Sequence, residues 1–224
     1  RPDGLGTARV LTVDPQAFPR VGLKSFPATL PLADHEVVLT FDDGPFPATT
    51  NKVLAALASE CVRATFFLIG QNAQANPQIV RAIAAAGHGI GHHTWSHRIL
   101  STIGEARALE ETDRGIGADA AALGHAPSAK TRFFRFPGFA STPPLLARLE
   151  ARGMVVFGAD LWASDWNPMT PEQQLALLTA RLEQARKGII LLHDTKQQTA
   201  RMLPDFLRYL KRGGYKVVHV VPAG

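Results

Sequence analysis

Short apolar runs alternate along this chain with segments of helical period. Apolar runs bounded by polar or turn residues are typical of buried strands, whereas apolar residues three and four positions apart are typical of amphipathic helices. The runs predict strands at 36–41, 64–69, 88–91, 132–136, 154–158, 188–192 and 215–221. The helical pattern predicts helices at 49–60, 77–86, 104–123, 143–152, 171–186 and 199–212.

This alternation predicts an α/β fold with a parallel sheet, because parallel strands need helical crossovers and are buried on both faces. About seven strand–helix units favour a closed or nearly closed (β/α) barrel over an open sheet. Residues 1–35 are rich in Pro and Gly, with one expected strand near 8–13, and are predicted to form an arm packed on the barrel. Residues 36–224 are predicted to form a single catalytic domain.

Composition narrows the class of protein. A chain of 224 residues, 46% hydrophobic, is long enough to bury a full core. The net charge is +5, but Lys and Arg are scattered, so we expect no nucleic-acid partner. No run approaches the ~18 apolar residues of a transmembrane helix. Cys61 is the only cysteine, which excludes an intrachain disulfide and predicts a small buried hydrophobe at that position.

Charged or metal-binding side chains follow five of the predicted strands. In a parallel barrel the carboxyl ends of the strands form one rim, where catalytic groups collect. The side chains are Asp42 and Asp43 after 36–41, His92, His93 and His97 after 88–91, Arg135 at the end of 132–136, Asp165 beyond 154–158, and His193 after 188–192. We therefore expect all of them on one rim.

The histidine group is the strongest indication of a metal. His93 and His97 are four residues apart, so one helical turn or tight loop can direct both imidazoles at a single ion. Two imidazoles and one carboxylate leave room for water on zinc or a similar divalent metal, as in a catalytic site. A structural role fits His92 better than ligation. The alternatives are polar loop histidines without a metal and, for residues 43–44, the Asp-Gly turn of a hairpin, which leaves Asp42 unexplained.

These residues resemble the motifs of a known family. In order, Thr-Phe-Asp-Asp-Gly (40–44), His-Thr-x-Ser-His (93–97), Arg-x-Pro (135–137), Asp-Trp (165–166) and Leu-x-His (191–193) match the five motifs of the NodB-type polysaccharide deacetylases, carbohydrate esterase family 4. The resemblance covers about residues 36–220. It implies a distorted (β/α) barrel of about seven parallel strands, the NodB homology domain. It also implies removal of acetyl groups with one divalent metal, Zn²⁺ first, with Co²⁺ or Ni²⁺ as alternatives.

The resemblance further implies a role for each residue at the rim. Asp43, His93 and His97 would be the metal ligands, and a water molecule on the metal would be the nucleophile. Asp42 would be the general base that takes a proton from this water, and Arg135 would hold Asp42 in place.

On the opposite side of the substrate, His193 would be the general acid that protonates the leaving amine, with Asp165 orienting and charging it. An amide leaving group is poor unless it is protonated, and a histidine paired with a carboxylate suits this task near neutral pH.

The chain departs from the family pattern near the expected substrate. Gly138 and Phe139 follow Arg135-x-Pro137, where the family often has Tyr and Gly; the backbone N–H that the family lends to the oxyanion could still come from Gly138. The family's Asn before the first ligand histidine is His92, and its acid three residues before Asp165 is Trp162. Substrate contacts are expected from Trp95, Pro137, Gly138, Phe139, Trp162, Trp166 and Leu191.

The sequence thus predicts a hydrolase acting on an N-acetylated, GlcNAc-type polysaccharide or oligosaccharide, working as a monomer. Because the chain begins Arg-Pro rather than with Met, we expect that a signal peptide, an anchor or an expression leader was removed. An extracytoplasmic location is also expected. One alternative is a deacylase of another small amide or an O-acetyl ester; small-amide relatives commonly lack the metal triad. A second is a non-catalytic glycan-binding relative, which would be expected to lose Asp42 or His193 first.

Overall fold

The computed structural model describes residues 3–124 and 131–224. Its strands are β1 (Thr7–Val13), β2 (Arg20–Val21), β3 (Glu36–Asp42), β4 (Thr65–Leu68), β5 (Gly89–His92), β6 (Phe133–Phe134), β7 (Val155–Phe157), β8 (Leu161–Trp162), β9 (Gly188–His193) and β10 (Lys216–Pro222). Its helices are α1 (Pro47–Ser59), α2 (Gly70–Ala75), α3 (Pro77–Ala85), α4 (Glu105–Leu123), α5 (Pro143–Ala151), α6 (Pro171–Ala185) and α7 (Gln197–Arg212), with 3-10 turns at Leu100–Thr102 and Pro137–Phe139. Every strand pairing among the described residues is parallel, so the predicted α/β class is confirmed.

The strands form one curved sheet around β3. Strand β3 pairs with β9 over residues 37–42, with β10 at 36–37 and with β4 at 40–42. Pairing runs unbroken from β8 through β9, β3, β4, β5, β6 and β7 to β2. Within the described ranges no pairing joins β8 to β7 or β2. The strands therefore follow a distorted barrel that is left open between its first and last members.

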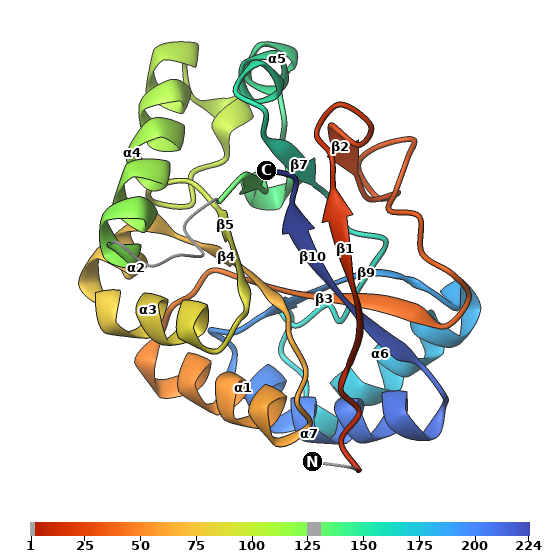
Figure 1. Ribbon diagram of the computed structural model, residues 1–224. Coiled ribbons are helices and arrows are strands. Elements are labelled where there is room, and N and C mark those ends of the chain that lie inside the picture. The colour runs from red at the N-terminus through yellow and green to blue at the C-terminus, as the bar shows by residue number, and fades with distance from the viewer. Residues whose placement is uncertain (1–2, 125–130) are drawn as a thin grey trace.

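The N-terminal segment contributes to this sheet. Strand β1 pairs with β10 along its length, and β2 pairs with β7. An ion pair of 2.7 Å between Arg9 on β1 and Glu36 at the start of β3 joins the segment to the barrel. Strands β1 and β10 lie side by side at the front of Figure 1. The division of the chain at residue 35 stays a prediction.

The two faces of β3 explain why polar side chains enter the barrel. Val37, Leu39 and Phe41 are fully buried in a core cluster shared with helices α1, α3, α6 and α7, which lie along the lower part of Figure 1. Val38 belongs to a second cluster, inside the barrel. Because side chains alternate along a strand, Thr40 and Asp42 point into the barrel above Val38.

Several short elements differ from the predicted pattern. Helix α2 and strands β2 and β8 were not predicted; the two strands have two residues each, too few to give a period. Cys61 is exposed, so the prediction of a buried position is wrong. It lies in the turn between α1 and β4 with a left-handed backbone (φ 55°), which carries its side chain outward.

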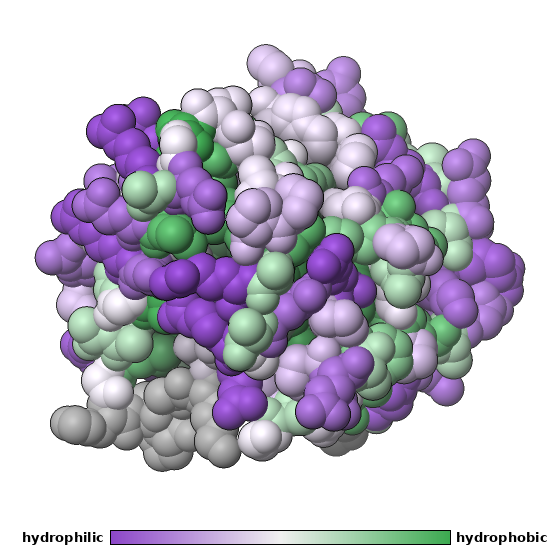
Figure 2. Space-filling view, turned by 90° about the horizontal axis from the view of Figure 1, so that it is seen from above, coloured by the Kyte–Doolittle hydropathy of each residue, from purple (hydrophilic) through white to green (hydrophobic). Residues whose placement is uncertain are grey.

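The surface seen from above is largely hydrophilic. Figure 2 shows hydrophilic residues across most of this face, with hydrophobic residues in small separate areas. None of the helices in the described part of the chain is both long and apolar enough to cross a membrane.

Candidate metal centre and active site

The strand register brings the predicted rim residues to one level. Asp42 is the last residue of β3 and lies opposite His193, the last residue of β9. His92 ends β5 and is in register with Leu68 of β4 and Phe134 of β6. The residues that follow these positions therefore gather at the carboxyl end of the barrel, as the sequence predicted.

Asp43, His93 and His97 form a group with the geometry of a metal site. The Oδ1 atom of Asp43 lies 3.5 Å from Nε2 of His93 and 3.3 Å from Nε2 of His97, and one ligand atom from each residue falls within 4.8 Å of the others. This Oδ1 is buried without a hydrogen-bond partner in the described structure. A buried carboxylate oxygen without a partner is costly unless a ligand takes it. The donor set of one oxygen and two nitrogens therefore fits a divalent metal.

Hydrogen bonding fixes the tautomer of the buried His93. Its Nδ1 lies 2.7 Å from the carbonyl oxygen of Arg135, so Nδ1 carries the proton and Nε2 presents a lone pair to the group. Burial lowers the pKa of His93, although the charges of Asp42 and Asp43 oppose this. The neutral ring is the form that binds a metal.

The backbone around the group is held in an uncommon conformation. Asp43, Thr94 and His97 have φ values of 78°, 66° and 60°, in the left-handed region that non-glycine residues rarely adopt. Gly44 is required for a different reason, since a Cβ there would lie 2.1 Å from Oδ2 of Asp194. The fully buried Asp194 accepts a 2.5 Å hydrogen bond from Thr50 Oγ1 on α1, and burial raises its pKa to about 7. Asp194 therefore packs directly against Gly44, the residue that follows Asp43.

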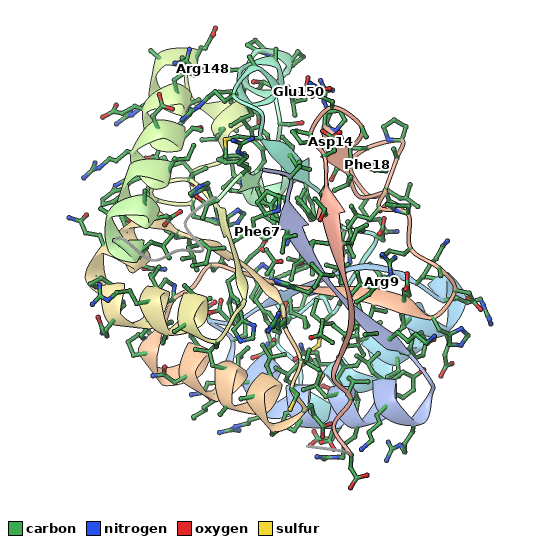
Figure 3. The ribbon with its side chains drawn as sticks, viewed as in Figure 1. Arg9, Asp14, Phe18, Phe67, Arg148 and Glu150 are labelled. Carbon is green, nitrogen blue, oxygen red and sulfur yellow. The ribbon has the colours of Figure 1, made fainter. Side chains whose placement is uncertain are left out.

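Arg135 holds Asp42 beside the group. It is fully buried, and its NH1 donates to Asp42 Oδ1 at 2.7 Å and to Thr40 Oγ1 at 2.9 Å. Its NH2 donates to the carbonyl of Gly158 at 2.7 Å. The guanidinium lies 4.2 Å from the ring centroid of Phe67, which Figure 3 places in the middle of the molecule. The other carboxylate oxygen of Asp42, Oδ2, faces His93 and lies 3.7 Å from its Nε2.

Replacing Arg135 with Met should destabilise the fold strongly. The substitution leaves Asp42 as a buried carboxylate without its cation, and breaking a buried ion pair in this way costs about 3–5 kcal/mol. Chemical denaturation of Arg135→Met measures the loss. In the Asp42→Asn background the same substitution should cost less, because no charge is left behind; an equal cost in both backgrounds would mean that Arg135 acts through packing alone.

His193 and Asp165 form a second pair across the cavity. Nδ1 of His193 donates to Asp165 Oδ1 at 2.7 Å, while Asp165 Oδ2 accepts from the His193 backbone N–H and from Thr199 Oγ1, each at 2.7 Å. Burial alone would lower the pKa of His193, but the hydrogen bond and charge of Asp165, with the charges of Asp42 and Asp43, outweigh it and raise the pKa to about 9. The raised pKa favours the protonated form of this ring.

Asp42, His93, His97 and His193 open into one cavity of about 370 Å³. It is lined by Asp42, His93, His97, Phe136, Gly138, Phe139, Trp162, Trp166, Leu191 and His193. Five of the seven predicted substrate contacts are in this set, and the buried Pro137 lies in the sequence between two of the lining residues. Trp95 is not in it. The Trp95 ring is buried and packs under the guanidinium of Arg114 on α4, 3.7 Å from its centroid, so the prediction of a substrate contact there is not supported.

Comparison with known proteins now decides the family. The polysaccharide deacetylase family model matches residues 30–157 of the chain. The chain belongs to the polysaccharide deacetylase family.

Relatives within this family share a large part of the chain. A chitooligosaccharide deacetylase of Sinorhizobium fredii is 36% identical over 162 residues, which are 70% of this chain and 71% of that protein. The one from a Bradyrhizobium species is 30% identical over 202 residues, 84% of this chain and 90% of that protein.

Solved structures agree with these relatives. A Bdellovibrio bacteriovorus peptidoglycan deacetylase superposes with a TM-score of 0.87 at 31% identity, covering 99% of this chain but only 61% of that one. A family 4 carbohydrate esterase from Streptomyces lividans, solved in complex with acetate, has a TM-score of 0.70 at 32% identity, covering 81% and 91%. The parallel α/β fold is thus the polysaccharide deacetylase fold.

Sequence reasoning missed part of the support behind the deacetylase site. His92 points away from the ligand group: its Nδ1 lies 2.6 Å from Asp119 Oδ2, and its Nε2 lies 2.8 Å from Thr131 Oγ1. Both His92 and Asp119 are fully buried, and burial raises the pKa of Asp119 to about 6. For Asp119, the only signal in the sequence was the presence of an acid within the Ala-rich face of the predicted helix 104–123. For Asp194, the signal was the presence of an acid directly after His193.

Proposed function

We propose that this protein is a metal-dependent hydrolase that removes acetyl groups from an N-acetylated, GlcNAc-type polysaccharide or oligosaccharide. The observation that carries the proposal is the unpartnered, buried Oδ1 of Asp43 beside the imidazole nitrogens of His93 and His97. These two histidines line a cavity together with Asp42 and His193. The names of the chitooligosaccharide and peptidoglycan deacetylases among its relatives support the substrate class.

Asp43, His93 and His97 would hold the metal. We propose Zn²⁺, with Co²⁺ or Ni²⁺ as alternatives, because two imidazoles and a carboxylate are a common set for catalytic zinc. Such an ion supplies Lewis acidity toward the attacking water and the acetyl carbonyl.

Asp42 serves as the general base. Arg135 occupies its Oδ1, so Oδ2 is the atom left to accept a proton from the attacking water. Because Arg135 also bonds Thr40 and Gly158, the carboxylate is held in one orientation before the substrate arrives. A base fixed in this way needs little reorganisation as the reaction proceeds.

His193 serves as the general acid on the other side of the scissile bond. Asp165 fixes the Nδ1 proton, and Nε2 donates its proton to the nitrogen of the departing amine as the C–N bond breaks. The pKa of His193, raised to about 9, keeps this proton in place at neutral pH. The backbone N–H of Gly138, which lines the cavity, can stabilise the oxyanion.

The charged His193–Asp165 pair favours an amide substrate over the alternatives. An alcohol leaving group has less need of a proton than an amine, so an O-acetyl ester requires this acid less. A glycan-binding relative without catalysis requires neither His193 nor the positioned Asp42.

An acetate-release panel tests the proposed function. We expect release from chitin oligomers and peptidoglycan, and much less from acetylxylan and small amides. Protein carrying Asp42→Asn serves as the matched blank. Release confined to acetylxylan would make the protein an O-acetyl esterase, and release confined to small amides would move it out of the glycan class.

We further propose that the protein acts outside the cytoplasm and as a monomer. Peptidoglycan, the polymer for which the Bdellovibrio bacteriovorus relative is named, belongs to the cell envelope. Cell fractionation tests the location, and light scattering on the purified protein tests the oligomeric state.

A further inference from the structure

We infer that Lys24 and Trp162 form a subsite beside the active site for a sugar that carries a carboxylate, so that the preferred substrate is an acidic glycan. This inference rests on the proposed deacetylase function. It names the chemical class of the neighbouring sugar, which the family assignment leaves open between neutral chitin-type and acidic peptidoglycan-type polymers.

A row of aromatic rings leads from the catalytic acid to Lys24. The Trp166 ring centroid lies 6.0 Å from His193, and the Trp162 ring lies 5.8 Å from Trp166. Phe139 stacks on Trp162 at 6.1 Å, with 23° between the planes. The ammonium of Lys24 lies 5.4 Å from the centroid of Trp162. Exposed aromatic rings stack on the apolar faces of sugars, and Trp166, which is 47% exposed, offers such a ring between His193 and Trp162.

A second cavity, of about 420 Å³, shares the lining residue Trp162 with the first. It is lined by Lys24, Asp160, Leu161, Trp162, Arg181, Gln184 and Ala185. Because Trp162 lines both cavities, we place the neighbouring sugar of a bound glycan at the second one.

The second cavity presents a net positive charge. Its only acid, Asp160, already accepts hydrogen bonds from the backbone N–H groups of Leu23 and Ile189 and from Thr29 Oγ1. Arg181 also has fixed partners, since its NH1 donates to the carbonyl of Trp162 and to Ser164 Oγ. No carboxylate or carbonyl of the described residues binds the exposed ammonium of Lys24, so this charge is available to a ligand.

The backbone places Lys24 firmly in this position. Its N–H donates to the carbonyl of Ala159 at 2.9 Å, and the N–H of the preceding Leu23 donates to Asp160 at 2.8 Å. Both bonds join the N-terminal segment to the connection between β7 and β8. Lys24 precedes residue 30 and Trp162 follows residue 157, where the family match begins and ends. The pair is therefore outside the residues that the family model matches.

The chemistry of this pair selects a carboxylate. A neutral GlcNAc polymer offers the ammonium only hydroxyl and amide oxygens, whereas a glycan in which every second sugar bears a lactyl ether offers a carboxylate. An exposed ammonium–carboxylate pair is weak and is screened by salt. We therefore expect a preference of about threefold to fivefold in kcat/KM at low ionic strength.

Matched glycans test the subsite. Acetate release is measured on a tetrasaccharide of alternating N-acetylglucosamine and N-acetylmuramic acid, and on the same tetrasaccharide with its carboxylates converted to amides. The native protein should prefer the free acid, and high salt should reduce the preference. Lys24→Met should bring the ratio of the two kcat/KM values to about one, and Lys24→Glu should reverse it. Lys52→Glu makes the same charge change on the exposed face of α1. This variant should have the same ratio of the two kcat/KM values as the native protein.

The outcomes separate this inference from the proposed function. Acetate release with equal kcat/KM on acid and amide, or a preference that Lys24→Glu does not alter, overturns the subsite and leaves the deacetylase proposal standing. If neither glycan releases acetate, the deacetylase proposal fails. In that case, calorimetry of the binding of each glycan to the Asp42→Asn protein tests the subsite separately. We expect the acid glycan to bind more tightly than the amide, and equal affinities would contradict the subsite.

Discussion

Complete removal of divalent metal is expected to abolish acetate release, and added Zn²⁺ or Co²⁺ is expected to restore it. The reason is the ligand group itself: the buried Oδ1 of Asp43 has no hydrogen-bond partner in the described structure, and the Nε2 atoms of His93 and His97 lie within 3.5 Å of it. Without an ion the group has no means of polarising the acetyl carbonyl. The measurement is acetate release by chelated protein before and after titration with each metal.

Thermal unfolding gives a second measurement that does not depend on turnover. A ligand that binds only the folded protein stabilises it by about 2.7 kcal/mol at a hundredfold excess over its dissociation constant. Zn²⁺ should therefore raise the Tm of the native protein but not that of Asp43→Asn, which keeps the size of the side chain. Full activity of protein shown by elemental analysis to be free of metal would overturn the mechanism.

The arrangement of Asp43, His93 and His97 lowers the stability of the fold. Asp43, Thr94 and His97 have left-handed backbones, and the Oδ1 atoms of Asp43 and Asp194 are buried without partners among the described residues. Each of these features opposes folding, and each is found in or next to the group of Asp43, His93 and His97. Such local conflicts are characteristic of functional sites, which the rest of the fold must stabilise.

The main strands could be predicted because each is a run of apolar residues long enough to recognise. Strand β3 shows why the rim could be predicted as well. Its apolar run ends at Asp42, and parallel pairing with β9 sets Asp42 level with His193. The end of an apolar run is visible in the sequence, and parallel topology then brings such ends together.

Features set by a single tertiary contact could not be predicted. Strand β8 has two residues, and pairing with β9 alone makes it a strand. Trp95 lies between His93 and His97 in the sequence, yet its ring turns toward Arg114 on α4. Lys24 approaches Trp162 only because the N-terminal segment bonds the β7–β8 connection. No local pattern records where these side chains point.

Asp42→Asn and His193→Ala should each lower kcat by at least about 10²-fold while leaving the metal bound, because each removes a proton-transfer group and neither is a ligand. The asparagine keeps the size of the side chain and can still accept from Arg135, so its effect reports the lost base rather than a disturbed fold. Steady-state kinetics with metal analysis of each variant provides the test. Rates equal to that of the native protein would remove the residue from the mechanism.

The pH profile distinguishes the acid from a merely structural histidine. Asp165 raises the pKa of His193, and the reaction needs the protonated ring, so kcat should fall as the pH rises through that pKa. Asp165→Asn withdraws the charge and should move this alkaline limb to lower pH, and His193→Ala should remove the limb. An alkaline limb that survives in His193→Ala would assign the proton to another group. The assignment of the base to Asp42 and of the acid to His193, on opposite sides of the scissile bond, would then be wrong.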